Sequence, residues 1–366
     1  MSESFDIAVV GGGAAGIAAA VCAARAGCKT LLLDSRHAAG GTGGFSGLTT
    51  LCGLHAEDGR FLNGGFSREF AEDLMHEDGV HEPLKMGRLF VQLYRPASFQ
   101  KVATCLLAAE PLLSTRWNTP LSNVAVWNRR IHRLNGETVG AVIDCTGKAD
   151  VGRAVGEQLL ATDDMTQASS VIFPLENVEH DLGTPVGVAQ VLLAVAHAGL
   201  PPLSFMPCAE AGVVAVKFAG QPDEVPRLLK FLRGQISGFE RCQTPQTEFT
   251  IARRACTMIF GRHLLTGDDV LGARKFPDAV ARGCWPVEQW SADGRQRLRY
   301  LPTGGHYEIP ARSLQAARME NLFMAGKSLS ADVDAVASAR VMGCCLATGD
   351  AAGQLAAAFV KCTRVK

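Results

Sequence analysis

The stretch DIAVVGGGAAGIAAA, residues 6–20, decides the fold. Its apolar run ends in Gly11, Gly13 and Gly16 at the spacing G-x-G-x-x-G, and an alanine-rich run follows. The first run predicts a buried parallel strand, and the second predicts a helix. In such a turn one glycine permits the bend, one admits a pyrophosphate close to the backbone, and one lets the helix pack closely on the strand. We therefore expect a dinucleotide at the N-terminus of this helix.

A second predicted strand, KTLLLD at residues 29–34, ends in a carboxylate. Asp34 lies about 20 residues past the glycine turn, where an acid accepts a hydrogen bond from a ribose hydroxyl. Residues 35–55 are then glycine-rich with little regular pattern, whereas a plain NAD domain would continue with strand-helix units. Gly40 to Gly44 can expose consecutive backbone N–H groups, a nest suited to a second approach to the same pyrophosphate.

Two later segments add to this pattern. AVIDCTGKADVG, residues 141–152, is typical of a strand that ends in Thr146 and Gly147. The segment from Leu322 predicts a strand, a glycine at 326, an irregular crossing, and a long helix from about residue 340 to the C-terminus.

Together the three segments resemble the FAD-dependent oxidoreductases with a glutathione-reductase-type FAD domain. More narrowly, they resemble the single-flavin branch related to the fumarate-reductase and thiazole-biosynthesis flavoproteins. The matching stretches are VIDCTGKADV, LLTGDDV, EIPARSL and AGKSLSADVDAVASARVMGCCLATGDAAG, and they span nearly the whole chain. The resemblance implies FAD as the cofactor and an α/β fold. That fold is a glutathione-reductase-type, Rossmann-like FAD-binding domain with an inserted α+β substrate domain.

The resemblance also implies a set of FAD-binding residues at matching positions. They are Gly11, Gly13, Ala14, Ala15, Gly16, Asp34, Ser35, Gly41, Thr42, Leu121, Thr146, Gly147, Gly326, Arg340 and Val341. The last helix would point its N-terminus at the flavin, where the helix dipole favours the reduced, anionic ring.

We expect the FAD-binding domain to be discontinuous. It takes residues 1–165 and 315–366, and residues 166–314 form the substrate domain. A strand near 88–96 is expected to be lent to the substrate domain.

Four residues are catalytic candidates. Cys52 and His55 follow the glycine-rich segment and could act as a base or a thiolate pair, although their spacing also suits packing on one helical turn. Arg312 matches an arginine of the resembled family and could anchor a substrate anion; the alternative is an interdomain salt bridge. His306 in a predicted loop is a further acid/base candidate, as is Tyr307.

The substrate side departs from the resembled pattern. Arg254 matches the first arginine of an arginine-rich family segment, but Thr257 and Met258 replace the pair that follows. Trp290 stands where the family has histidine, and Ala311 stands where it has tyrosine. These departures argue against simply transferring a substrate from the family.

Composition excludes several classes of protein. Lys plus Arg and Asp plus Glu both total 36, so no basic field for nucleic acid or an anionic membrane is expected. The twelve cysteines form no Cys-x-x-Cys pair, so we expect no metal site and interpret them as buried thiols of a reducing compartment. The apolar window 186–200 is too short to span a bilayer, and the N-terminus lacks a signal-peptide pattern. We expect a cytoplasmic protein.

The sequence favours an oxidoreductase that moves a hydride from a small organic substrate to FAD. No second G-x-G-x-x-G follows another strand, so the flavin is expected to be reduced by its substrate or by a redox partner protein. Two alternatives remain. One is a flavin monooxygenase with an external reductant, and the other is a flavoprotein subunit that exchanges electrons with a partner protein.

Overall fold

The central sheet is built on the strand that precedes the glycine turn. A computed structural model describes residues 3–163, 167–246, 248–291 and 295–364. Its main sheet has the order β6-β2-β1-β9-β8-β7, and β20 also pairs with β9. The strands are β1 (Ser4–Val10), β2 (Thr30–Leu33), β6 (Leu113–Arg116), β7 (Val124–Trp127), β8 (Arg130–Leu134), β9 (Glu137–Asp144) and β20 (Leu322–Met324). Strands β6, β2, β1, β9 and β20 run parallel, while β7 and β8 form an antiparallel meander. Asn135 and Gly136 both have positive φ in the β8–β9 turn, as the Asn-Gly pair predicts.

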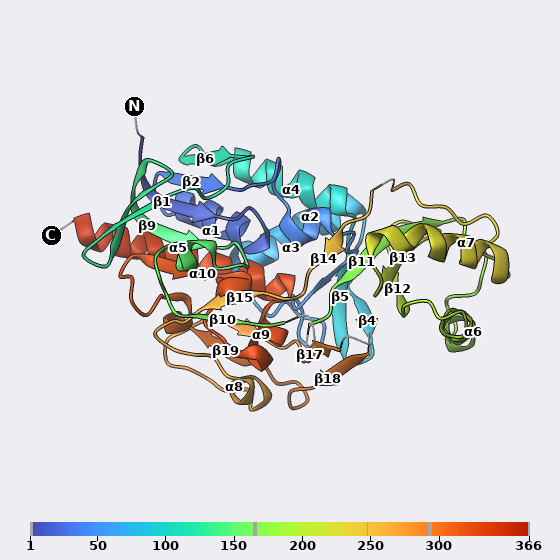
Figure 1. Cartoon of the computed structure of the whole chain (residues 1–366). Coiled ribbons are helices and arrows are strands. Elements are labelled where there is room, and N and C mark those ends of the chain that lie inside the picture. Colours follow the sequence, from blue (N-terminus) through green and yellow to red (C-terminus); the bar gives the residue numbers. More distant parts are fainter. Residues whose placement is uncertain (1–2, 164–166, 247, 292–294, 365–366) are drawn as a thin grey trace.

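Helices α1 (Ala14–Arg25) and α10 (Met342–Arg364) pack together against this sheet (Figure 1). A Cβ on Gly349 would overlap the carbonyl oxygen of Ala15, and one on Gly353 would lie 2.6 Å from the carbonyl oxygen of Ala19. The small residues of the last helix therefore let two helix backbones touch. Helices α3 (Gly65–Asp78) and α4 (Pro96–Ala108) complete the core on this side.

The glycine-rich segment differs from its expected form. It is not an irregular nest: a short helix, α2 (Gly41–Phe45), begins after Gly40. Strand β3 (Thr50–Cys52) follows and belongs to a three-stranded sheet with β5 (Leu89–Leu93) and β4 (Leu84–Met86). The strand expected near 88–96 therefore does not extend the sheet of the substrate domain. It pairs with β3 and β4 because Gly87, with φ +63°, turns β4 directly back onto β5.

An inserted lobe projects from this body (right in Figure 1). By inserted lobe we mean the described residues between 170 and 252. Its antiparallel sheet has the order β12-β13-β11-β14 and packs with helices α6 and α7 around a core that includes Phe173 and Phe218. The elements are β11 (Ser170–Glu176), α6 (Pro185–His197), β12 (Leu203–Pro207), β13 (Val213–Phe218), η1 (Pro222–Glu224), α7 (Val225–Gln235) and β14 (Ile251–Ala252).

The chain after the lobe does not join the core of the lobe but packs against the C-terminal helices. Residues from Cys256 to Leu314 share a core with α9 (Val333–Ala339) and with Ala347 and Ala351 of α10. The other elements of this part are β15 (Thr257–Ile259), α8 (Gly267–Leu271), β16 (Ala279–Gly283), β17 (Val287–Trp290), β18 (Gln296–Arg299), β19 (Tyr307–Pro310), η2 (Ala311–Leu314) and η3 (Gly326–Ser328). Two elements that precede the lobe, α5 (Asp150–Ala154) and β10 (Leu159–Ala161), complete the set, and β10 pairs with β15. The expected substrate domain 166–314 thus contributes to two cores, and the domain division stays a prediction. Among the described residues, no helix combines the length and apolarity needed to cross a membrane.

Candidate active site

The three sequence segments meet at the carboxyl ends of β1 and β9. Gly11 has φ +106°, and a Cβ there would lie 2.6 Å from the carbonyl oxygen of Cys145 and 2.9 Å from the amide nitrogen of Thr146. A Cβ on Gly326 would lie 2.8 Å from that of Ala15. The glycines therefore allow three chain segments to approach within van der Waals contact, at the sheet edge where dinucleotides bind.

The first turns of α1 and α2 lie next to each other and form a cradle, which includes Gly13, Gly40 and Gly41. Gly13 is the N-cap of α1 and Gly40 is the N-cap of α2, and neither helix has a side-chain cap. The N–H of Gly40 donates to the carbonyl oxygen of Gly12 at 2.9 Å, which draws the two helix starts together. Among the described residues, the atom nearest to a Cβ on Gly13 would be the Cα of Gly41, at 3.7 Å. Uncapped first-turn N–H groups bind anions, so the cradle fits a pyrophosphate.

Asp34, the residue predicted to bind the ribose, is buried just after β2. Its Oδ2 accepts from the N–H of Gly12 at 2.5 Å, and its Oδ1 accepts from the N–H of Arg36 at 2.7 Å. The carboxylate therefore also holds the glycine turn. The indole of Trp117, which the sequence did not single out, would lie 2.8 Å from a Cβ on Gly12. Leu121 is half-buried and packs on the core beneath.

A buried carboxylate, Asp144, ties the second and third segments together. Its Oδ1 accepts from the N–H and the hydroxyl of Thr146 and from the hydroxyl of Ser328, and its Oδ2 accepts from the N–H groups of Val151 and Gly152. Burial raises the pKa of Asp144, although these hydrogen bonds favour the ionised form. The network fixes Thr146 and the end of η3 beside the glycine turn.

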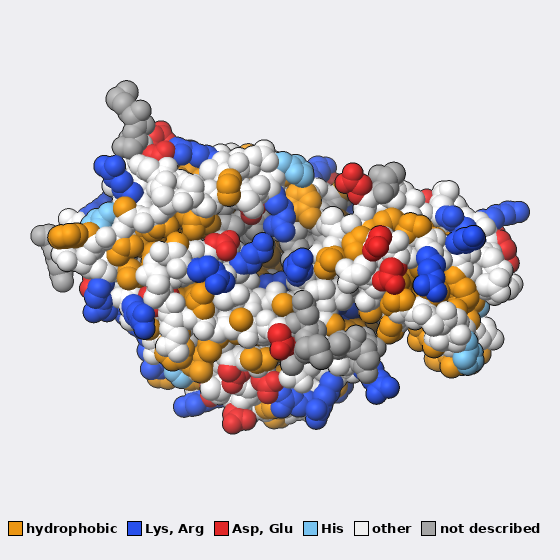
Figure 2. Space-filling model, viewed as in Figure 1, with side chains coloured by type: hydrophobic (Ala, Val, Ile, Leu, Met, Phe, Trp, Pro, Cys, Tyr) orange, Lys and Arg blue, Asp and Glu red, His pale blue; other side chains and the backbone are white. Residues whose placement is uncertain are grey.

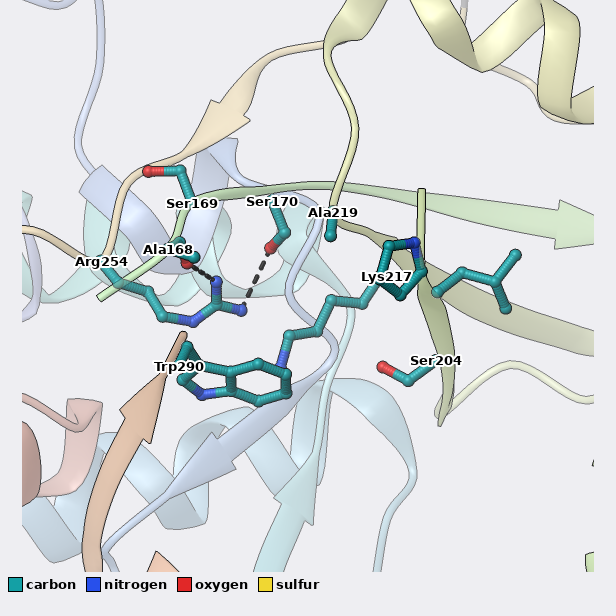
Figure 3. A pocket seen from close by; sticks show the side chains of 10 residues that line it. Ala168, Ser169, Ser170, Ser204, Lys217, Ala219, Arg254 and Trp290 are labelled. Atoms are coloured by element: carbon teal, nitrogen blue, oxygen red, sulfur yellow. Dashed lines mark hydrogen bonds between the residues drawn. The ribbon is translucent and has the colours of Figure 1, made fainter. Parts of the chain in front are cut away.

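The pocket on the lobe side is lined by cations and one indole (Figure 3). Lys217 on β13 and Arg254 just after β14 flank Trp290 of β17, with Ser170 and Ser204 beside them. The cavity measures about 40 Å³. On the face drawn in Figure 2, Lys and Arg side chains also gather around a hollow near the middle of the molecule.

Arg340 connects this pocket to the last helix. It caps α9 just before α10 begins, and its guanidinium donates to Oε1 of Gln167 at 2.9 Å. Its Nε is buried and has no partner among the described residues. The neighbouring Val341 packs on Gly53. Arg340 is therefore half-buried, with one buried donor, Nε, that is left unsatisfied. Its contact with FAD stays a prediction.

The pair of Cys52 and His55 is only partly consistent with a catalytic role. Burial raises the pKa of Cys52 to about 12, so it is a neutral thiol at pH 7 and not a thiolate. His55 is buried, its Nδ1 lies 3.1 Å from the carbonyl oxygen of Gly59, and its Nε2 has no partner among the described residues. Burial lowers the pKa of His55, which keeps the imidazole neutral.

Arg312 and His306, like Cys52 and His55, do not line this pocket. The guanidinium of Arg312 pairs with Asp278 through Nε at 3.0 Å and Nη2 at 3.2 Å, a salt bridge within residues 166–314 rather than between the two expected domains. His306 lies just before β19 and its carbonyl oxygen accepts from Lys275. Tyr307 is buried and hydrogen-bonds Ser338 at 2.9 Å.

The sequence analysis missed Lys217 and did not assign Arg254 or Trp290 to one site. A signal existed for Lys217, because it is the only charge within the apolar strand VVAVKF. No local pattern joins it to residues 37 and 73 positions further along the chain.

The fold and the cradle define a flavoprotein of the Rossmann-like class. The chain matches the family model described as FAD dependent oxidoreductase over residues 6–198 and 202–364, and it therefore belongs to that family. Comparison with curated proteins gives no match.

Solved structures share the fold at low sequence identity. A geranylgeranyl bacteriochlorophyll reductase-like protein from Thermoplasma acidophilum is 15% identical, with a TM-score of 0.53 over 99% of this chain and 80% of that one. The p-nitrophenol 4-monooxygenase PnpA from Pseudomonas putida DLL-E4 is 11% identical, with a TM-score of 0.52 over 99% and 82%. GidA from Aquifex aeolicus is 13% identical, with a TM-score of 0.52 over 98% and 64%. The protein is thus an enzyme of the FAD-dependent oxidoreductase type, and the expected fold is confirmed.

Proposed function

We propose that this FAD-dependent oxidoreductase is a dehydrogenase or oxidase that takes a hydride from a small organic substrate. The observation that carries the proposal is the cavity of about 40 Å³ between the inserted lobe and Trp290. Its size suits part of a small molecule, and its cations and serine hydroxyls supply the few convergent polar groups typical of substrate pockets. Bound FAD supplies the hydride acceptor.

The chain's own residues bind, orient and shield the substrate in this proposal. Lys217 and Arg254 orient a polar end of the substrate over the face of Trp290. The inserted lobe closes one side of the cavity and excludes water. For the proton that leaves with the hydride we propose His55 as acceptor, because it is neutral and its buried Nε2 has no partner among the described residues.

A flavin monooxygenase is the second candidate function. The fold similarity to p-nitrophenol 4-monooxygenase is the observation that favours it. The two functions differ in the source of electrons. A dehydrogenase or oxidase is reduced by its own substrate, whereas a monooxygenase needs an external reductant such as NAD(P)H.

The test is anaerobic reduction of the purified, FAD-loaded protein. We expect a small organic molecule from a panel of hydroxy acids, amino acids and amines to bleach the long-wavelength flavin band without any other protein. Bleaching by NAD(P)H alone would favour the monooxygenase, and bleaching only by a protein fraction would favour the electron-transfer subunit. His55→Gln should slow bleaching while leaving FAD content unchanged.

A further inference from the structure

The ammonium of Lys217 faces the cavity without an anionic partner. Its Nζ lies 3.2 Å from the centroid of the Trp290 ring, and the structure gives it no hydrogen bond or ion pair among the described residues. A cation on an aromatic face keeps only part of the stabilisation that water or a carboxylate would give. The Lys217 ammonium is therefore a desolvated positive charge that can still donate hydrogen bonds into the cavity.

A second cation lies on the same indole. The guanidinium carbon of Arg254 lies 4.6 Å from the Trp290 ring centroid. Arg254 donates to the carbonyl oxygen of Ala168 and to the hydroxyl of Ser170 at 3.1 Å, both uncharged acceptors. Its orientation is thus fixed while its charge is not neutralised by either contact.

The buried carboxylate of Glu288 already accepts three hydrogen bonds. The oxygens of Glu288 accept from the indole N–H of Trp285 at 2.7 Å, the indole N–H of Trp290 at 2.6 Å, and the amide of Gln296 at 2.9 Å. No ion pair joins Glu288 to Lys217 or Arg254 in the described part of the chain. Glu288 holds the two indoles, and its single negative charge offsets only part of the two positive charges of Lys217 and Arg254.

We propose that Lys217 and Arg254 bind the carboxylate of the substrate over Trp290, so the substrate is a small organic carboxylate. This inference rests on the proposed function, because it names the substrate class of the same pocket. A cavity of about 40 Å³ has room for roughly three water-sized groups, which matches a carboxylate with its first carbon. A flexible ammonium beside a fixed guanidinium charge, both on the face of one indole, suits a flat, singly charged anion.

In this proposal the substrate anion is bound by Lys217 and Arg254, and not by Arg312 as the sequence predicted. The pairing of Arg312 with Asp278 already uses its planar fork, whereas the acceptors of Arg254 are neutral and Lys217 has none among the described residues.

Binding of carboxylate probes to the FAD-loaded protein tests the proposal. The probes are benzoate, acetate and succinate, with benzamide as the uncharged match of benzoate, and perturbation of the flavin spectrum and tryptophan fluorescence reports binding. We expect benzoate to bind at least about tenfold more tightly than benzamide, because a charge-assisted contact is lost in the amide. Lys217→Met and Arg254→Gln should each weaken benzoate by about 10- to 100-fold and leave benzamide little changed.

Matched variants remove surface cations instead. Lys230→Met lies on α7 of the same lobe and Arg312→Gln lies outside the pocket lining, so both should bind benzoate as the parent protein does. Equal affinity for benzoate and benzamide, failure of every carboxylate probe to bind, or unchanged benzoate binding in both pocket variants would overturn the proposal. Tighter binding of inorganic phosphate than of any carboxylate would also overturn it. FAD content and anaerobic bleaching are measured in parallel, so failure of the proposed function is seen separately.

Discussion

A Cβ on Gly41 would lie 2.6 Å from the Cα of Gly13, whereas a Cβ on Gly13 would lie 3.7 Å from the Cα of Gly41. The two glycines face each other across the cradle, but only Gly41 is needed by the protein's own packing. Gly41 also has φ +51°, a conformation that strains other residues. We propose that the space beside Gly13 takes the pyrophosphate of FAD.

Because of this difference, substitution of Gly13 should affect FAD binding alone, whereas substitution of Gly41 should also affect the stability of the protein. Gly13→Ala should keep the unfolding midpoint close to that of the apoprotein and lose most of the bound FAD, because its methyl group fits the protein but occupies the pyrophosphate position. Gly41→Ala should lower both the unfolding midpoint of the apoprotein and the amount of bound FAD. The measurements are FAD content by absorbance and thermal unfolding of the apoproteins. Stoichiometric FAD in Gly13→Ala would contradict the placement of the pyrophosphate.

Asp34 holds both a ribose hydroxyl and the glycine turn in our interpretation. Asp34→Ala leaves the buried N–H of Gly12 without its acceptor, so we expect a loss of about 1–3 kcal/mol in the free energy of unfolding of the apoprotein. FAD affinity should fall by about 10- to 150-fold, measured by titration of the apoprotein with FAD. Asp34→Asn keeps a carbonyl acceptor and should recover part of the stability but little of the FAD affinity. An unchanged FAD affinity in both variants would show that the ribose is held elsewhere.

Asp144 should be a structural support of the cofactor site rather than a contact. Asp144→Asn places an amide N–H₂ among donors, because its carboxylate accepts from Val151, Gly152, Thr146 and Ser328. We expect a loss of about 1–3 kcal/mol in the free energy of unfolding, with weaker FAD binding as a consequence. Denaturant unfolding of the apoprotein checks the first effect. Ser328→Ala removes one donor only and should cost less; an equal or larger loss would contradict the network.

The FAD cradle could be predicted from the sequence because its signals are local. The turn after β1, the acid that ends β2 and the Thr-Gly pair after β9 each stand within a few residues of a strand end, where the sheet itself brings them together. The substrate pocket could not be predicted in this way. Lys217, Arg254 and Trp290 come from three separate elements, and only the folding of the inserted lobe against β17 makes them neighbours. The salt bridge of Arg312 could not be predicted either, because its partner Asp278 lies 34 residues away in the sequence.

Carboxylate binding should depend on pH through Lys217. Burial and the charges of Arg254 and Arg340 lower the pKa of Lys217 to about 7, against the opposing charge of Glu288. The pKa of Arg254 is lowered only to about 10, so this side chain stays charged at neutral pH. Benzoate affinity should therefore be constant below about pH 7 and fall by up to tenfold per pH unit above it, as the ammonium loses its proton. Lys217→Met should bind weakly with a flat profile from about pH 6 to 9, because benzoate stays ionised across that range. A parent profile that is equally flat, or an affinity that rises with pH, would show that Lys217 is not the group that meets the carboxylate.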